Sequence, residues 1–290
     1  MKRALFGIVF AGGIALTVYG FWEGVPERDL ADAVHRGDRA AVQKLLAWRP
    51  GLAGAKVYPQ GMEPWRTGRF RGPADVEWRG RYLIHDIVGM GGDPAMLELL
   101  AASGAELDVR LEGRTLLHEA ARGGNVESAA WLLDHGADIE ARNDCADPCA
   151  ERGRTALHDA ISSGRRDVLE FLLARGAAPG AADADGRTAL HLASSLGSVD
   201  DAWVLCRYGA EGAVKDAQGR AAPDVAADAA GEAGYGPGAM ADWLKPGGAC
   251  DTLAARRRAS GLAVDEDEAR VVFAAFRCAR GVAEACTPPR

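Results

Sequence analysis

Apolar positions recur along this 290-residue chain in a register that repeats every 33 residues. Three near-identical blocks mark the register: Gly-Arg-Thr-Leu-Leu-His at 113–118, and Gly-Arg-Thr-Ala-Leu-His at 153–158 and again at 186–191. The three histidines are 40 and 33 residues apart, and the longer interval holds seven additional residues around two cysteines. Each histidine is followed after six residues by a glycine and after fourteen and fifteen by apolar residues. A period of this length predicts a stack of short helical units.

The same offsets find further units on both sides of the three blocks. Counting 33 residues back from His118 reaches His85, and counting 33 forward from His191 reaches Asp224. Upstream, Gly37 and the pair Leu45–Leu46 keep the spacing of a first unit. The register therefore predicts about six helix-turn-helix units, with modified sequences at the two ends.

This pattern resembles the ankyrin repeat family, whose consensus combines Thr-Pro-Leu-His with a glycine after the first helix, Leu-Leu in the second and Gly-Ala at its end. The resemblance implies an all-α solenoid of about six repeats over residues 25–245, with insertions at 57–80 and 144–152. It also implies that the motif histidines bond within and between repeats. The motif threonines are expected to cap the first helices, and Gly136 and Gly176 to stop the second helices in a left-handed conformation.

Residues 1–24 form a separate segment. Lys2 and Arg3 precede nineteen uncharged residues, 4–22, which as a helix would reach roughly 28 Å, close to the thickness of a hydrocarbon core. We expect a signal anchor that crosses the inner membrane and leaves the body in the periplasm, because positive charge precedes the segment. Two alternatives stay open. A cleaved signal peptide would make the protein periplasmic, and an ordinary buried helix would imply no export.

The six cysteines agree with export, because disulfides persist in oxidising compartments. Cys145 and Cys149 lie in a loop-like sequence, which favours a local bridge over the alternative of a zinc site. In the C-terminal region 246–290 we predict a disulfide-supported helical cap with one bridge among Cys250, Cys278 and Cys286. Cys206 replaces a leucine of the repeat, which predicts a buried thiol.

The first insertion interleaves aromatic and basic residues. Tryptophan, tyrosine and arginine are enriched at binding hot spots because they combine large contact area with directional polarity. The insertion is therefore one candidate partner-binding surface, although its aromatic residues could instead cover the end of the first repeat. The candidate residues are Trp65, Arg66, Arg69, Phe70 and Trp78.

A second candidate surface follows from the family resemblance. Ankyrin arrays bind proteins with finger loops, which connect one repeat to the next, and with the concave face of their first helices. On this chain the matching positions are Arg110, Glu119, Arg122, Arg142, Asp159, Ser162, Asp185 and Arg187, with Glu112, Arg114, Asp183, Lys215, Asp216, Ser163, Ser194 and Ser195 as further members.

Composition and motifs exclude several classes of function. A 48% apolar and 26% charged chain is too hydrophobic to be disordered, and a net charge of −7 argues against wrapping nucleic acid. The sequence holds no nucleophile elbow, phosphate loop, paired-carboxylate arrangement or metal signature. We therefore expect no enzyme activity, cofactor, metal or small-molecule substrate.

Two functions remain as expectations. The first is an immunity-type inhibitor that covers a secreted or envelope-acting toxin or lipase, because an acidic body with long insertions suits blockade of a basic cleft. The alternative is a periplasmic scaffold or protective accessory of an envelope enzyme. A bacterial source is expected from the preference for arginine over lysine and from the short N-terminal segment.

Overall fold

A computed structural model describes residues 26–54, 56–57, 81–89, 91, 93–146, 149–233, 239–261, 264–265 and 271–272. The expected signal segment and the aromatic and basic residues of the first insertion lie outside these ranges. Within them, no helix combines the length and apolar character needed to cross a membrane. The chain divides into two compact units, one containing residues 1–87 and 92–107 and the other containing 88–91 and 108–290.

The first unit holds two helix pairs and a short pair of strands. Helices α1 (Pro26–His35) and α2 (Arg39–Trp48) precede a 3-10 turn, η1 (Pro50–Gly54), and are followed by α3 (Leu83–Gly89) and α4 (Pro94–Ala102). Strands β1 (Lys56–Val57) and β2 (Arg81–Tyr82) pair antiparallel where the first insertion leaves and re-enters the array. This pair departs from the expected all-helical architecture, because two chain segments that run side by side can satisfy each other's backbone groups.

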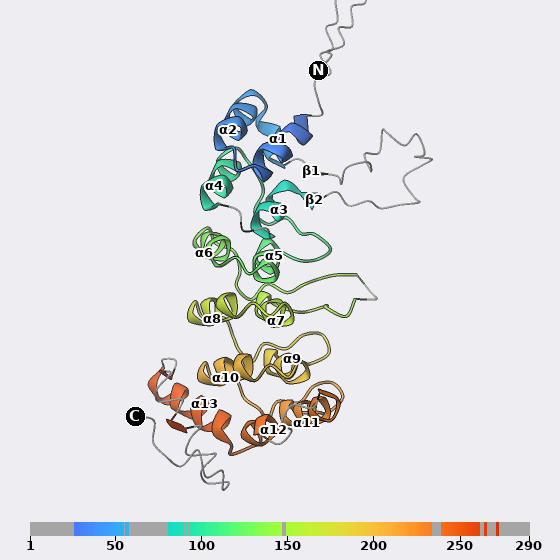
Figure 1. Ribbon diagram of the computed structural model, residues 1–290, viewed down its shortest axis with the longest axis vertical. Helices are drawn as coiled ribbons and strands as arrows, with labels where there is room; N and C mark the ends of the chain where they lie inside the picture. Colours follow the sequence, from blue (N-terminus) through green and yellow to red (C-terminus); the bar gives the residue numbers. More distant parts are fainter. Residues whose placement is uncertain are drawn as a thin grey trace, which may run out of the picture. The chain divides into compact units, whose positions relative to one another are not determined.

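The second unit is a series of helix pairs followed by one further helix (Figure 1). In chain order these are α5 (Leu116–Gly123) and α6 (Val126–Asp134), α7 (Ala156–Ser162) and α8 (Arg166–Ala174), α9 (Ala189–Ser195) and α10 (Val199–Arg207), α11 (Ala222–Ala233) and α12 (Ala239–Leu244), and α13 (Ala249–Ser260). First helices contact first helices, α5 with α7, α7 with α9 and α9 with α11. Second helices contact second helices in the same way, so the predicted paired-helix repeat is confirmed.

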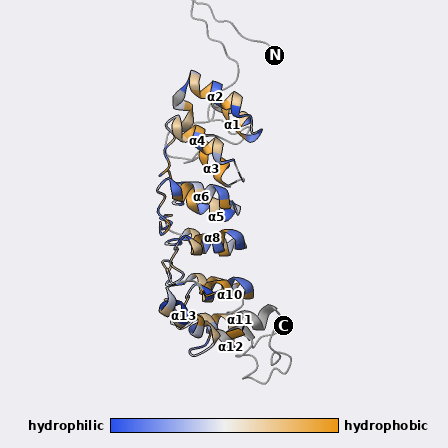
Figure 2. Ribbon diagram, turned by 90° about the vertical axis from the view of Figure 1, so that its left-hand side faces the viewer, coloured by the Kyte–Doolittle hydropathy of each residue, from blue (hydrophilic) through white to orange (hydrophobic). Residues whose placement is uncertain are grey.

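The core of the second unit is an apolar layer between its helices. Leu117, Leu157 and Leu190, which precede the motif histidines, are at most 2% exposed. Apolar and polar residues alternate within single helices, as the ribbon coloured by hydropathy shows for α8 and α10 (Figure 2). No helix pair could bury its apolar side alone, so each repeat depends on its neighbours for stability.

The first helices begin with the predicted threonine caps. In α5 the backbone N–H of Thr115 donates to Nδ1 of His118 at 3.3 Å, and the Thr115 hydroxyl lies 2.8 Å from the same nitrogen. The same arrangement recurs at α7 and α9. In α11, where the sequence has Ala221 and Asp224, the carboxylate of Asp224 accepts the Ala221 N–H at 3.0 Å. Aspartate thus replaces histidine as the acceptor at the modified end.

The other ring nitrogen of the motif histidines in α5, α7 and α9 links one repeat to the next. Nε2 lies 2.9 Å from the Arg154 carbonyl for His118, 3.2 Å from the Arg187 carbonyl for His158 and 3.1 Å from the Arg220 carbonyl for His191. The bonding within and between repeats expected for these histidines is confirmed. After the second helices, Gly136 and Gly176 have φ values of 87° and 98°, the left-handed conformation predicted for them.

Two disulfides are present among the described residues. Cys145 is bonded to Cys149, so the predicted local bridge is present. Cys250, however, is bonded to Cys206, with a Cα–Cα distance of 4.9 Å. The prediction that Cys206 is a thiol is therefore wrong, although the residue is buried as expected, and Cys250 is not available for a bridge within the C-terminal region. The reason is that α13 packs against α10 and brings these two buried residues together. Cys278 and Cys286 lie outside the described residues.

Candidate functional site

The finger loops of the second unit are held by side chains that bond to the loop backbone. Asp183 accepts the backbone N–H groups of Asp185 and Arg187, each at 2.9 Å, and Asp216 occupies the same place in the next loop. In the longer loop, Asn143 accepts the N–H of Cys145 at 3.0 Å. Such local bonds fix loop shape together with antiparallel bridges such as that between Ala182 and Thr188. The loops are therefore preorganised supports for the residues that they carry.

Arg110 and Arg142 connect one finger loop to the next. Nη1 of Arg110 donates to the carbonyls of Gly113 at 2.9 Å and Arg142 at 2.8 Å. Nη1 of Arg142 in turn donates to the carbonyl of Gly153 at 3.1 Å and to that of Ala182. Both guanidinium groups are bonded to loop carbonyls, so these two arginines brace the finger loops. Their contact with a partner stays a prediction.

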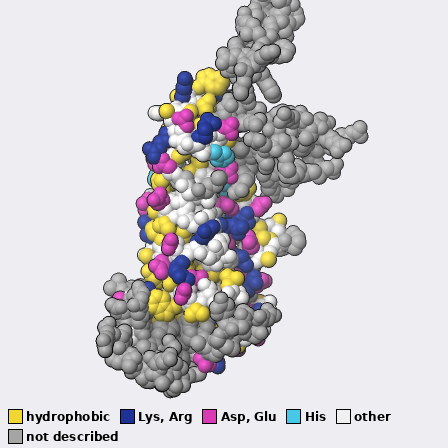
Figure 3. Space-filling model, viewed as in Figure 1, with side chains coloured by type: hydrophobic (Ala, Val, Ile, Leu, Met, Phe, Trp, Pro, Cys, Tyr) yellow, Lys and Arg dark blue, Asp and Glu magenta, His cyan; other side chains and the backbone are white. Residues whose placement is uncertain are grey.

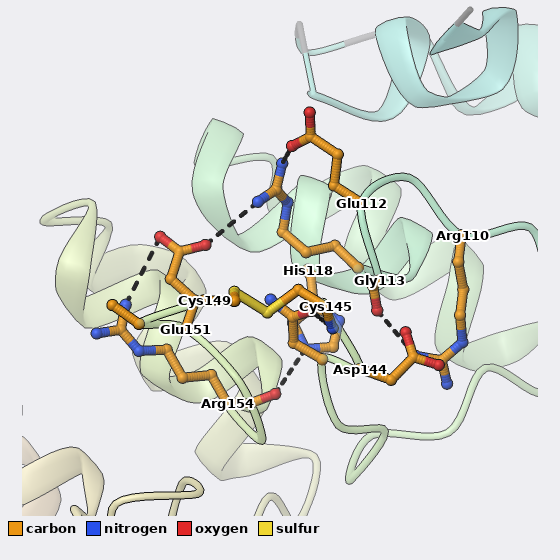
Figure 4. Close-up of a disulfide and its surroundings, with 12 residues drawn as sticks. Arg110, Glu112, Gly113, His118, Asp144, Cys145, Cys149, Glu151 and Arg154 are labelled. Atoms are coloured by element: carbon orange, nitrogen blue, oxygen red, sulfur yellow. Dashed lines mark hydrogen bonds and ion pairs between the residues drawn. A yellow bond between two sulfur atoms is a disulfide. The ribbon is translucent and has the colours of Figure 1, made fainter. Parts of the chain in front are cut away.

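Seven charged side chains gather where these loops meet the first helices α5 and α7. Arg114 is the most connected of them: Nε donates to Glu119 at 2.9 Å, Nη1 to Glu151 at 3.2 Å and Nη2 to Glu112 at 2.7 Å. Figure 4 shows the carboxylates of Glu112 and Glu151 turned toward the same guanidinium group. Its side chain is only 14% exposed, so water weakens these ion pairs less than it would at an open surface. We call this cluster the charged face; its members are Glu112, Arg114, Glu119, Arg122, Glu151, Arg154 and Asp159.

Glu151 is the centre of the charged face. Its carboxylate lies 3.2 Å from Arg114, 3.4 Å from Arg122 and 3.8 Å from Arg154. Glu151 follows Cys149 in the second insertion, so the short disulfide loop precedes the residue that joins three arginines. Acidic and basic side chains are consequently interspersed at the level of α5 and α7 (Figure 3). A surface with interspersed charges favours partners that place opposite charges against each of its side chains.

Asp159 differs from the other members because it is fully buried, at 0% exposure, and neither of its oxygens has a hydrogen-bond partner among the described residues. Burial, and secondarily the negative charge of Glu151, raise the pKa of its carboxyl group to about 7, against the opposing effect of the nearby arginines. A carboxyl group in this environment changes its charge near neutral pH.

The motif histidines beside this face are neutral structural groups. Burial lowers the pKa of His158 to about 4 and also lowers the pKa of His118. Their ring nitrogens are all bonded, as described above. In the part of the chain that the structure describes, no group of three histidine, cysteine or acidic side chains is placed to hold a metal ion.

The structure brings together some of the predicted contact residues and separates others. Glu119, Arg122 and Asp159 belong to the charged face, and Ser162 adjoins it through a 3.4 Å bond from Arg154. Asp185 and Arg187 are paired with each other at 2.7 Å on the following finger loop. Arg187 also bonds Asp183 and the Ala150 carbonyl. Trp65, Arg66, Arg69, Phe70 and Trp78 lie outside the described residues.

Sequence reasoning did not assign Glu151 or Arg154 to a binding surface. Arg154 is part of the repeated Gly-Arg-Thr block and was interpreted only as a marker of the register. Its spacing from Asp159 is the same as that of Arg114 from Glu119, five residues, and this spacing was a usable signal. Glu151 lies in an insertion outside the register, so no repeat position indicated its role.

The fold and this face define a helical repeat protein whose rigid loops present charged side chains. A family model for ankyrin repeats in three copies matches residues 30–143, 84–183 and 141–216. The chain belongs to the ankyrin repeat family, whose members are protein-binding modules.

Individual relatives are similar over parts of the chain. Protein phosphatase 1 regulatory subunit 27 of Mus musculus is 32% identical over 121 residues, which is 41% of this chain and 74% of the relative. The Homo sapiens protein of that name is 39% identical over 73 residues, 25% of this chain and 43% of the relative. The NF-kappa-B inhibitor cactus of Drosophila melanogaster is 39% identical over 70 residues, 24% of this chain and 13% of the relative.

Proposed function

We propose that this chain binds a protein partner with its charged face and finger loops, works outside the cytoplasm, and inhibits a secreted or envelope-acting toxin or lipase. The observation that carries the proposal is the charged face itself. It is built from two consecutive repeats and held by bonds within the loops, so little side-chain freedom is lost when a partner docks.

The inhibitory part of the proposal rests on charge and on analogy. A net charge of −7 favours encounter with a basic enzyme surface and suits occlusion of a basic cleft. Two of the relatives are named as a regulatory subunit and as an inhibitor. Those names describe the relatives, and they make regulation by binding a reasonable function for the present chain.

The extracytoplasmic location is supported by the disulfides and by the N-terminal sequence. The bonds Cys145–Cys149 and Cys206–Cys250 would persist in an oxidising compartment such as the periplasm. Residues 4–22 have the length and apolar character of a membrane anchor or signal segment. We propose an inner-membrane anchor with a periplasmic body, or a periplasmic protein if the segment is cleaved.

Photo-crosslinking tests the binding surface. A photoreactive amino acid replaces Arg122 on the charged face in one variant and the exposed Glu170 on α8 in a matched control. The proposal expects a discrete crosslinked protein from Arg122 and none from Glu170. Equal crosslinking from both positions, or crosslinking from Glu170 alone, would contradict the assignment of the face.

The activity of the crosslinked partner then decides between inhibition and its alternative. Purified partner is assayed with and without one equivalent of the full chain. Loss of a hydrolytic or toxic activity supports the immunity-type role. Unchanged or increased activity would reject inhibition and support the scaffold or protective accessory expected as the alternative.

A further inference from the structure

The spacing of arginine and acid by five residues occurs in two consecutive repeats with different results. In the α5 repeat, Nε of Arg114 donates to Glu119 at 2.9 Å, so the two side chains form a hydrogen-bonded ion pair. In the α7 repeat, Arg154 and Asp159 occupy the same two positions. There Nε of Arg154 and both oxygens of Asp159 are buried without hydrogen-bond partners among the described residues. The pair is open.

The length of the acidic side chain explains the difference. Aspartate is one carbon shorter than glutamate, which withdraws its carboxylate by about 1.5 Å. Arg154 is directed elsewhere through Nη1, which lies 3.8 Å from Glu151 and donates to Ser162 at 3.4 Å. An unmatched donor and an unmatched acceptor thus belong to the same two register positions that bond each other in the preceding repeat.

Charged groups act on Asp159 from the α5 repeat and from its own finger loop, whereas the charged residues of α8, which also packs against α7, are exposed: Arg166, Asp167 and Glu170. Arg114 and Arg122 come from the α5 repeat, and Glu151 and Arg154 come from the finger loop; all four act on its titration. His158, its neighbour in α7, has both ring nitrogens bonded. On α9 the equivalent position is the apolar Leu192, and the one titratable residue of that helix, His191, is also bonded at both nitrogens.

The charges of the face balance only while Asp159 is neutral. Arg114, Arg122 and Arg154 then stand against three glutamates, which are Glu112, Glu119 and Glu151. Ionisation of Asp159 adds a fourth negative charge inside the protein, close to Glu151. Burial of an unpaired charge is costly, so ionisation favours any movement that brings a cation to the carboxylate.

We propose that Asp159 is a proton-dependent switch in the charged face: while it is protonated, Arg154 stays with Glu151 and Ser162, and when it loses its proton to solvent, Arg154 turns onto it. Glu151 keeps Arg114 and Arg122 but loses its third arginine. The surface contributed by the finger loop changes shape, and the face gains one negative charge.

This inference rests on the proposed function insofar as it makes partner binding depend on pH. Above neutral pH the face carries an excess negative charge and favours a basic partner segment. Below neutral pH it is balanced. The raised pKa of Asp159, about 7, places the change within the physiological range.

Nuclear magnetic resonance of the full chain tests the switch without a partner. Carboxyl carbons of aspartate and Nε of arginine are labelled, and D159N and R154K identify the two signals. We expect the Asp159 carboxyl to titrate near pH 7 and the Arg154 Nε–H signal to shift with the same midpoint. In D159N the Arg154 signal should stay constant with pH.

D159E supplies the second variant. The longer side chain should reach Arg154 and form the ion pair that Glu119 forms with Arg114. The titration midpoint of its carboxyl group should therefore fall by at least one pH unit. The Arg154 Nε–H signal should then have the chemical shift of the bonded form near pH 7. D167N, at an exposed position of α8, should leave the wild-type titration unchanged. A pKa of Asp159 near the ordinary value of an aspartate would overturn the switch. So would an Arg154 signal that does not change as Asp159 titrates. Either result leaves protein binding itself untouched, and loss of binding would leave the titration intact.

Discussion

Asp159 and His158 are neighbours in α7, and burial moves their pKa values in opposite directions. Burial favours the neutral form of each group, which raises the pKa of the acid to about 7 and lowers that of the base to about 4. Both residues are therefore neutral in the folded protein between these values. In the unfolded chain both are charged over much of the same range. The two adjacent residues thus give stability opposite dependences on pH.

D159N should stabilise the protein most at high pH. Asp159 binds its proton more tightly in the folded chain, so its contribution is fully present below about pH 4 and is lost as pH rises toward about 7. At pH 8 the cost has an upper limit of about 4 kcal/mol, which pairing with Arg154 reduces. Urea unfolding should show a stability gain for D159N at pH 8 that shrinks toward pH 4.5. A gain that does not depend on pH, or one that D167N reproduces, would argue against a buried ionisable group.

His158→Asn should remove part of the sensitivity to acid. The pKa of His158 is lowered in the folded chain, so between about pH 6.5 and pH 4 the unfolded chain binds a proton here that the folded chain does not. His158 therefore lowers the free energy of unfolding as pH falls through this range. Asparagine can still accept the Thr155 N–H, as Asp224 does for Ala221 in α11. It loses the bond to the Arg187 carbonyl and some packing, at a cost of about 1–3 kcal/mol at pH 7. The destabilisation measured by thermal unfolding should be smaller at pH 5 than at pH 7; a constant difference would contradict this assignment.

At the scale of elements, the finger loops depend on the close approach of consecutive backbones. Gly113 has φ of 83°, and a side chain there would lie 2.2 Å from the backbone nitrogen of Cys145. Gly136 has a similar φ, 87°, but nothing lies within 4 Å of the place where its side chain would begin. The two glycines separate the cost of backbone strain from the cost of a steric clash.

Gly113→Ala should therefore destabilise the chain more than Gly136→Ala. Both substitutions place a side chain on left-handed backbone, which costs about 1–2 kcal/mol. Only Gly113→Ala also forces the α5 and α7 finger loops apart, at a further cost of about 1–3 kcal/mol. Denaturant unfolding measures the difference, and amide exchange should locate the added loosening at 143–145. Equal losses in the two variants would mean that the loops do not need this close contact.

The repeat elements could be predicted from sequence because each has several residues in fixed register. Threonine, histidine and glycine at constant offsets indicate where the first helix of a repeat begins and where the second ends. Helices α5 to α10 begin and end as these residues predict. Residues outside the register carried no such information. Glu151 lies in an insertion, and its three ion pairs depend on how that loop folds back toward α5. The bond between Cys206 and Cys250 depends on the direction in which α13 packs, which no local pattern specifies.

At the scale of the whole chain, the two disulfides differ in the length of chain that each one closes into a loop. Cys145–Cys149 closes a loop with a separation of 4 residues, whereas Cys206–Cys250 spans 44 residues and ties α10 to α13. In the chain-entropy description the stabilisation grows with the logarithm of loop length. The same description gives about 2 kcal/mol for the short loop and about 4 kcal/mol for the long one. The C-terminal end of the array should therefore respond most to reducing conditions.

Reduction should loosen the C-terminal helices before the rest of the second unit, because repeat arrays transmit stability mainly between neighbours. We expect a reductant to lower the urea midpoint of the full chain and to increase amide exchange first in α11 to α13, with α5 to α8 protected. C206A/C250A should show the same exchange pattern without reductant and should respond little to its addition. C145A/C149A is the matched control: it should lose less stability and should keep the response to reductant. Uniform loosening from α5 to α13 on reduction would contradict a local cap, and an unchanged C-terminal exchange would show that helix packing alone holds α13 on α10.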